Sequence, residues 1–135
     1  MFLHIDAADS TPVYDQIARQ VVFAVAGGAL AAGDLIPSVR ELARELAVNP
    51  NTVARAYREL QAQGVVESSP GVGLLVRSGA KRACQRARRE ALRQRVSSAL
   101  RATLDAGLDP DEAEALFRAE LDKLCHRYQR PGESA

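Results

Sequence analysis

Several residue types that build large cores or carry chemistry are scarce in this sequence. The 135 residues include no Trp, three Tyr and three Phe, so a folded core must be built mostly from Ala, Leu and Val. The two cysteines, Cys84 and Cys125, lie far apart, which argues against a disulfide framework and favours a reducing compartment. At this length the chain allows one compact domain, or a small domain with an appendage.

Membrane-directed segments and enzymatic signatures are also missing. No apolar run approaches the roughly 18 to 20 residues of a membrane span, and the N-terminus lacks the features of a secretory signal. We therefore expect a cytoplasmic protein without membrane contact. Only His4 and His126 are available as histidines, and no catalytic triad, phosphate-binding glycine loop or carboxylate pair can be assembled. We expect no enzyme, no catalytic residue, no metal site and no cofactor.

The cysteines leave one chemical alternative open. Cys84 lies among arginines in the sequence, and neighbouring positive charge would lower the pKa of its thiol and favour the reactive thiolate. Cys125 and the adjacent His126 could join it in a redox or metal sensor. The alternative, which we favour, is that both cysteines are inert.

The net charge of +1 hides a division between the two parts of the chain. Residues 1–79 carry six basic and eight acidic side chains, whereas residues 80–135 carry twelve basic and nine acidic ones. A net-negative first part argues mildly against nucleic-acid binding by bulk electrostatics, so the local placement of its arginines decides the matter.

The segment Pro37 to Gly64 has the pattern of two short amphipathic helices joined by a tight turn. Ser38, with Glu41 three residues later, forms a capping-box sequence at the start of the first helix. Asn49 is a good N-cap for the second helix, where Pro50 suits the first position. Apolar residues recur at helical spacing in both segments. This arrangement predicts a helix-turn-helix.

The outer face of the second helix carries side chains suited to reading DNA. Asn51, Arg55 and Arg58 lie at positions i, i+4 and i+7 and therefore share one face. Arginine can bind guanine with two hydrogen bonds and asparagine can bind adenine, while Thr52 can bond a phosphate from the first turn. A solvated polar face is the simpler alternative for these three residues.

The flanking segments complete the pattern of a winged helix-turn-helix. Residues 2–6 alternate as a short strand or an extended arm would, and Ser10 or Thr11 is the expected cap of a first helix that ends at Gly27-Gly28. Residues 65–77 contain two β-rich runs around a Pro/Gly turn, which predicts a hairpin. Gly71 at its tip could bring a backbone N–H close to a phosphate. A hairpin that only covers the core is the alternative.

The last part of the chain predicts two helices, from Ala80 to Ala106 and from the Asp109 cap onward. Each has an apolar seam, and two such helices bury little surface by themselves. Their seams most naturally meet those of a second subunit, with packing against the winged domain as the alternative. The candidate dimerisation residues are Leu92, Val96, Leu100, Leu104, Leu116, Phe117, Leu121 and Leu124. Tyr128 continues the second seam.

A basic stripe lies along the first of these two helices. Residues 81–101 hold eight basic side chains and one acidic side chain, with Arg82, Arg86, Arg89 and Arg93 spaced to share a face. A solvated face is the usual role of such a stripe, and contact with flanking phosphates is the alternative.

Taken together, the patterns predict a mainly α protein with a small β component (α+β). Residues 1–78 would form a winged helix-turn-helix DNA-binding domain, and residues 79–135 a two-helix antiparallel dimerisation hairpin.

The motifs IPSVRELA and NPNTVARAYREL, with the segment TPVYDQIARQ before them, resemble the GntR family of bacterial transcription regulators. The resemblance covers about residues 1–78, and the short two-helix tail is similar to the YtrA subfamily. It implies that Arg40 contacts the DNA backbone or a base, that Asn51, Thr52 and Arg55 face the major groove, and that Gly71 is the wing glycine. Pro50 departs from the arginine that many members carry there, which removes one potential base contact.

The resemblance implies a homodimeric regulator, most often a repressor, which reads a palindromic operator in double-stranded DNA and commonly controls an ABC-transporter operon and itself. It also allows a small-molecule effector of unknown identity. Our candidate DNA-binding residues are Ser38, Arg40, Asn49, Asn51, Thr52, Arg55, Arg58 and Gly71. A winged-helix protein-interaction module without specific DNA binding is the alternative, favoured by the negative first half and by Pro50.

Overall fold

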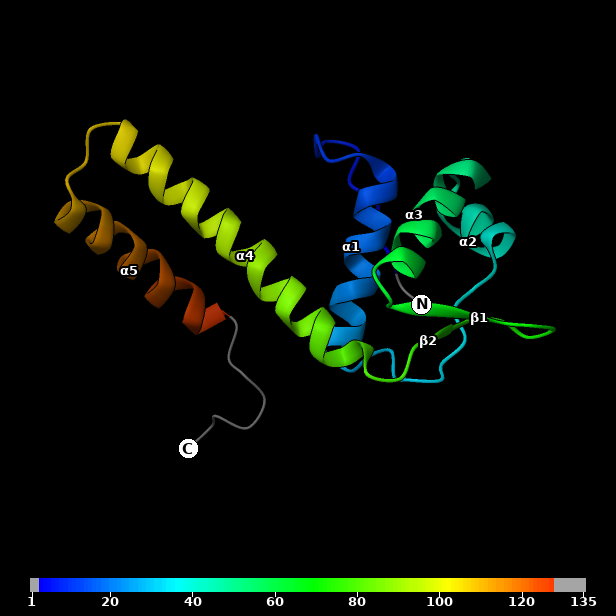
Figure 1. Ribbon diagram of the computed structural model, residues 1–135. Helices are drawn as coiled ribbons and strands as arrows, with labels where there is room; N and C mark the ends of the chain where they lie inside the picture. The colour runs from blue at the N-terminus through cyan, green and yellow to red at the C-terminus, as the bar shows by residue number, and fades with distance from the viewer. Residues whose placement is uncertain (1–2, 128–135) are drawn as a thin grey trace. The chain divides into compact units, whose positions relative to one another are not determined.

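The computed structural model describes residues 3–127, which form five helices and a two-stranded sheet. The elements in chain order are α1 (Val13–Ala26), α2 (Val39–Leu46), α3 (Pro50–Ala62), β1 (Val66–Ser69), β2 (Gly73–Val76), α4 (Ala80–Asp105) and α5 (Pro110–Arg127). They divide into two compact units, the first ending at Ala91 and the second beginning at Leu92 within α4. Figure 1 shows the elements of each unit. The predicted fold class is confirmed: the protein is mainly α, with a small β wing.

The first unit is a winged helix-turn-helix. α1 packs against α3, and α2 packs against α3 across a short turn. β1 and β2 pair antiparallel, with Val66 opposite Val76 and Ser69 opposite Gly73. A short extended segment before α2 lies on the other side of β2, where Leu35 bridges Leu75 and the Ile36 N–H donates to the Leu74 carbonyl at 3.0 Å. The wing is therefore tied to the chain that leads into α2.

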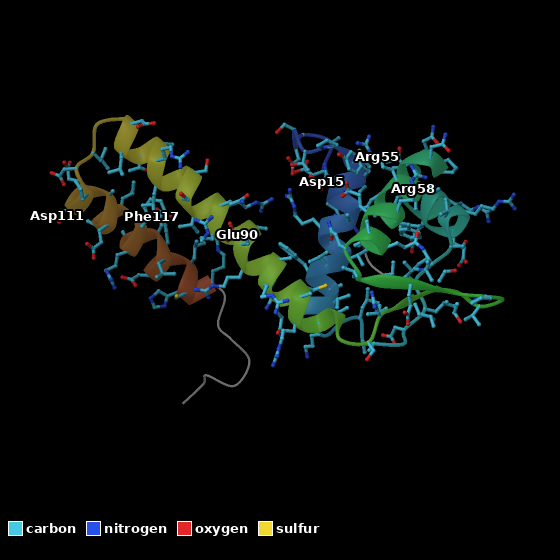
Figure 2. All side chains as sticks on the ribbon, in the orientation of Figure 1. Asp15, Arg55, Arg58, Glu90, Asp111 and Phe117 are labelled. Carbon is cyan, nitrogen blue, oxygen red and sulfur yellow. The ribbon has the colours of Figure 1, made fainter. Side chains whose placement is uncertain are left out.

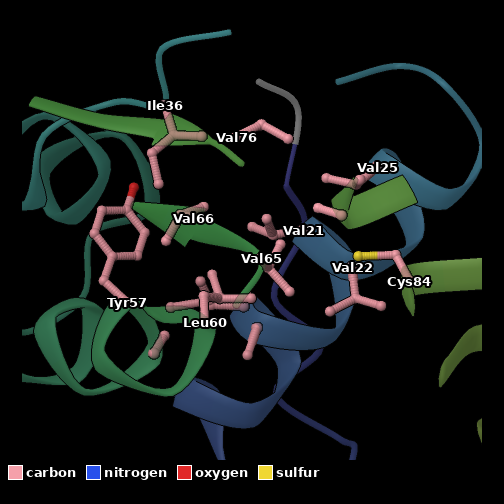
Figure 3. Packing of buried hydrophobic residues seen from close by; sticks show 14 of the residues in the cluster. Val21, Val22, Val25, Ile36, Tyr57, Leu60, Val65, Val66, Val76 and Cys84 are labelled. Carbon is pink, nitrogen blue, oxygen red and sulfur yellow. The ribbon is translucent and has the colours of Figure 1, made fainter. Parts of the chain in front are cut away.

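The core of this unit is aliphatic, as the scarcity of aromatic residues predicts. Ile17 and Val21 of α1 and Val53 and Leu60 of α3 have no measurable exposure. Figure 3 shows part of this cluster, which joins Leu60 of α3 to valines of α1, β1 and β2. Burying an aliphatic side chain of this size contributes about 1.5 to 3 kcal/mol. The α1–α3 contact thus fixes the position of α3.

The N-terminal arm is extended but forms no strand within residues 3–6. Two glutamines of α1 supply the hydrogen bonds that a neighbouring strand would otherwise supply. The buried Gln16 amide accepts from the Asp6 N–H at 2.9 Å and donates to the Asp6 and Thr11 carbonyls at 3.1 and 2.9 Å. Gln20 makes the same reciprocal pair with the backbone of His4. Phe2, the first residue of the predicted strand or arm, lies outside the described residues.

Most predicted helix ends are confirmed, and one is wrong. Ser38 and Glu41 form the reciprocal capping box, and Asp109 and Glu112 form a second one before α5. α1, however, begins after Pro12 without any side-chain cap, so neither Ser10 nor Thr11 has the predicted role. Pro12 holds the N-cap position, so Ser10 and Thr11 lie too early in the chain to cap the helix, and the Gln16 amide donates to the Thr11 carbonyl.

α4 belongs to both units. Its first turns bury Ala80 and Cys84 in the core of the winged unit, although the sequence placed the junction at Ser78-Gly79. The second unit contains the rest of α4, a short turn and α5, and among its described residues Ala113 is the buried one. Tyr128, the last residue of the predicted seam, lies outside the described residues.

Cys84 lies in the buried, inert environment that we favour, and not in that of a reactive thiolate. Its side chain is buried against Val22 and Val25 of α1 rather than among the arginines that surround it in sequence (Figure 3). Desolvation by burial raises the pKa of the Cys84 thiol, because a thiolate is disfavoured in an apolar environment. Cys125 is exposed on α5. Among residues 3–127, no three His, Cys, Asp or Glu side chains gather to hold a metal ion, and no helix is long and apolar enough to cross a membrane.

The burial of Cys84 predicts unequal thiol reactivity. At pH 8, iodoacetamide should label Cys125 at least about tenfold faster than Cys84, since a raised pKa and lack of access both slow the buried thiol. Mass spectrometry of the Cys84→Ser and Cys125→Ser variants gives the two rates separately. In denaturant the two rates should converge. Equal rates in the folded protein would contradict the burial of Cys84.

Candidate nucleic-acid interface

A sharp turn of three residues sets the angle between α2 and α3. Ala47 ends α2 in the left-handed region, at φ 55° and ψ 45°, and is the one non-glycine residue with positive φ among the described residues. Asn49 then caps α3, its Oδ1 accepting from the Asn51 N–H at 2.8 Å, and Pro50 occupies the first helical position. The predicted turn chemistry at Asn49 and Pro50 is confirmed. The left-handed alanine was not anticipated, because glycine or asparagine is usual at such a position.

α3 has a buried face and an exposed face, as its periodicity predicts. Val53, Ala56, Tyr57 and Leu60 are buried, whereas the side chains of Asn51, Arg55 and Arg58 are exposed and Thr52 is half-buried. Figure 2 shows Arg55 and Arg58 on this helix. α3 therefore presents one amide and two guanidinium groups on its outer side.

Tyr57 anchors the chain that enters α2. Its hydroxyl donates to the Pro37 carbonyl at 2.8 Å, joining residues twenty positions apart. Desolvation by burial, and then the negative charges of Glu41 and Glu45, raise the pKa of this phenol far above its usual value. Tyr57 thus stays protonated and keeps donating, which holds α2 against α3.

The candidate residues before α3 have mixed roles. Ser38 and Asn49 each use a side-chain oxygen in a helix cap, and each retains its hydroxyl or amide hydrogens to donate to another partner. Arg40 is exposed on α2 and lines a surface depression with Arg44 and Pro50 at the start of α3. Two guanidinium groups therefore lie beside a helix N-terminus, where anions are favoured.

The wing tip is open on its outer side. Gly71 lies at φ 76°, and a Cβ added there would meet nothing within 4 Å. Its backbone can therefore be approached closely by a ligand. Val72 and Leu35 expose apolar side chains nearby, and the Leu35 Cδ1 would lie 3.2 Å from a Cβ at Gly73.

One contact at the interface was missed by sequence reasoning. The guanidinium of Arg55 lies over the ring of Tyr14 of α1, with 3.8 Å between its central carbon and the ring centroid. This is a cation–π stack between two helices far apart in sequence. No periodicity within α3 could reveal it, because Tyr14 belongs to the first turn of another helix.

The candidate dimerisation residues lie in the second unit. Six of them expose 43 to 59% of their surface, and Leu100 and Phe117 are half-buried. Leu100 and Leu104 of α4 and Phe117 and Leu121 of α5 line one apolar groove, whereas Leu92, Val96, Leu116 and Leu124 lie outside it. Figure 2 labels Phe117 on α5. The two helices alone therefore leave much apolar surface uncovered.

The basic stripe of α4 is largely exposed. Arg82, Arg86, Arg89 and Arg93 all have exposed side chains, and Arg93 has an interaction within the chain. A solvated face accounts for these residues without a ligand.

Comparison with known proteins places this geometry in a family. The model of the "Bacterial regulatory proteins, gntR family" matches residues 13–76. The chain is 43% identical over 79 residues to the HTH-type transcriptional repressor YtrA of Bacillus subtilis, a match that covers 58% of this chain. The chain spans about three fifths of the length of such curated relatives, 61% for YtrA and 62% for the regulator Rv1152 of Mycobacterium tuberculosis.

Solved structures extend the similarity over most of the chain. A GntR family transcriptional regulator from Listeria monocytogenes superimposes with a TM-score of 0.71 at 30% identity, covering 85% of this chain and 98% of that one. YtrA from Sulfolobus acidocaldarius, a GntR-family transcription factor, gives a TM-score of 0.56 at 36% identity over 74% of this chain and 98% of that one. These relatives are transcription regulators rather than enzymes, as the sequence predicts. The fold, the helix-turn-helix motifs and the match together show that this chain belongs to the GntR family of bacterial regulatory proteins.

Proposed function

We propose that this protein is a sequence-specific DNA-binding repressor that acts as a homodimer on a palindromic operator. The observation that carries the proposal is the outer face of α3, where Asn51, Arg55 and Arg58 stand exposed on a helix fixed by its buried opposite face. In this proposal α3 enters the major groove.

The candidate residues divide into base-reading and backbone-contacting groups. Asn51 suits adenine, and Arg55 and Arg58 suit guanine, because their donors and acceptors match those base edges. Arg40, beside the N-terminus of α3, suits a phosphate, as do Thr52 and the backbone at Gly71. Ser38 and Asn49 would donate the hydroxyl and amide hydrogens that their caps leave free.

Dimerisation through the second unit would supply the affinity that one recognition helix lacks. The winged half has more acidic than basic residues, so its non-specific attraction to DNA should be weak. Apolar side chains left exposed on α4 and α5 favour burial against the same surface of a second copy. Two recognition helices about 34 Å apart would then read half-sites one helical turn apart.

The regulatory role is proposed from the relatives. YtrA of Bacillus subtilis is named a transcriptional repressor, and this name supports repression as the role here. From the family resemblance we extend the proposal to control of an ABC-transporter operon together with the gene for this protein itself, in the cytoplasm. A small-molecule effector belongs to the same proposal and is assigned no site.

The first test is selection of duplexes from a random pool by the full-length protein. The selected duplex should contain an inverted repeat and bind at least about 1,000-fold more tightly than random duplex at the same salt concentration. Gel-shift titration measures both affinities. Equal affinities would refute the proposal and would favour the protein-interaction module.

The second test separates backbone contacts from base contacts. Arg40→Ala should reduce the slope of log K against log salt by about one, because one phosphate contact is lost. Arg58→Ala should instead cost about 1 to 3 kcal/mol on the selected duplex and relax the preference at one base pair. Arg101→Ala, which removes the same charge from the far end of α4, is the control and should change neither quantity. A uniform loss in all three variants would contradict the division of roles.

The third test concerns the dimer. Leu104→Asp should convert the protein to a monomer, since it places a charge in the apolar groove. Light scattering after size exclusion measures the mass, and binding to the selected duplex should fall by at least about 100-fold. Ala102→Asp adds the same charge to an exposed position of the same helix and should leave the dimer intact. A dimeric Leu104→Asp protein would place the interface elsewhere.

A further inference from the structure

The stack between Arg55 and Tyr14 holds one side chain of the exposed outer face of α3 in a defined position. Arg55 lies near the middle of α3, and its guanidinium carbon is 3.8 Å from the ring centroid of Tyr14 in the first turn of α1. Arginine side chains on an exposed helix face otherwise sample many rotamers. The other arginine on this face, Arg58, stacks on no aromatic ring among the described residues.

The stack leaves the hydrogen-bonding capacity of Arg55 intact. A guanidinium group stacks through its flat face, while its five N–H donors point outward in its plane. Within residues 3–127, no hydrogen bond or ion pair engages the Arg55 guanidinium. Asp15, which follows Tyr14 in the sequence, does not pair with Arg55. Its carboxylate lies 3.9 Å from the guanidinium of Arg19 instead. The stack therefore fixes the orientation of the Arg55 guanidinium plane and leaves its N–H groups free to donate hydrogen bonds.

Tyr14 is itself held in place. It is half-buried and packs against the core cluster, one turn before the fully buried Ile17 of the same helix. α1 and α3 make the main interhelical contact of the winged unit. The ring thus has a defined position relative to α3, and its hydroxyl makes no hydrogen bond within the described part of the chain.

We propose that Tyr14 is a positioning residue for DNA recognition, because its ring holds the Arg55 guanidinium ready to bind the paired acceptors of a guanine. This inference rests on the proposed function. Tyr14 needs no contact with DNA in this role. It lowers the cost of ordering Arg55, so it raises affinity for the operator and not for random duplex.

The test uses the full-length protein and the duplex that the wild type selects from a random pool. Tyr14→Leu keeps an apolar side chain but removes the ring face, and it should weaken binding to the selected duplex about two- to tenfold while leaving binding to random duplex unchanged. Tyr14→Phe keeps the ring and should retain wild-type discrimination. In an Arg55→Ala background, Tyr14→Leu should have no further effect on discrimination.

Nuclear magnetic resonance of the free protein reports the stack itself. The ring current of Tyr14 should shift the side-chain protons of Arg55 upfield in the wild type and in Tyr14→Phe, and the shift should vanish in Tyr14→Leu. Thermal unfolding of each variant shows whether the winged unit remains folded.

The outcomes separate three cases. Equal losses on selected and random duplex, or an equal loss in the Arg55→Ala background, would mean that Tyr14 only stabilises the fold, and would overturn the inference. A Tyr14→Leu protein with wild-type discrimination would overturn it while leaving the proposed function standing. A wild-type protein that prefers no duplex would refute the proposed function, and the role of Tyr14 with it.

Discussion

The packing of α1 against α3 is the contact on which the rest of the winged unit depends. Small and medium aliphatic side chains make it, because the sequence supplies almost no aromatic residues for the purpose. Close packing of such side chains tolerates little change in volume, so α3 has a defined distance from α1 and a defined rotation about its own axis. From that contact follow the exposed face of α3 and the stack of Arg55 on Tyr14.

Features that depend on neighbours in sequence were predictable. The capping boxes at Ser38 and Asp109, the cap at Asn49 and the apolar stripe of α3 all arise within one turn of a helix, so spacing alone reveals them. The hairpin followed from the same kind of pattern, whereas its pairing with the segment before α2 joins residues far apart in sequence and was not predicted. The winged fold could be predicted from the sequence because each of its short elements is specified by residues close together in the chain.

Features that depend on the tertiary environment were not predictable. Cys84 has arginine neighbours in sequence and valine neighbours in space, and the second set decides its pKa. The cap expected at Ser10 or Thr11 is absent because α1 begins one residue later, with Pro12 in the N-cap position, and Gln16 instead reaches back to the arm. At the candidate interface, Arg55 was identified from its position on α3, but its support comes from another helix. Side-chain contacts across helices carry no periodic signal.

The two glutamines of α1 give the N-terminal arm a hold that does not depend on charge. Amide groups neither titrate between pH 2 and pH 12 nor respond to salt as ion pairs do, so this attachment is indifferent to both conditions. The attachment is, however, sensitive to slow deamidation of glutamine. Deamidation of Gln16 would replace the amide nitrogen with a carboxylate oxygen facing the Asp6 and Thr11 carbonyls, turning two attractions into repulsions. One slow hydrolysis at a buried side chain would thus weaken the attachment at Asp6 and Thr11 and leave the Gln20 pair with His4 as the main hold on the arm.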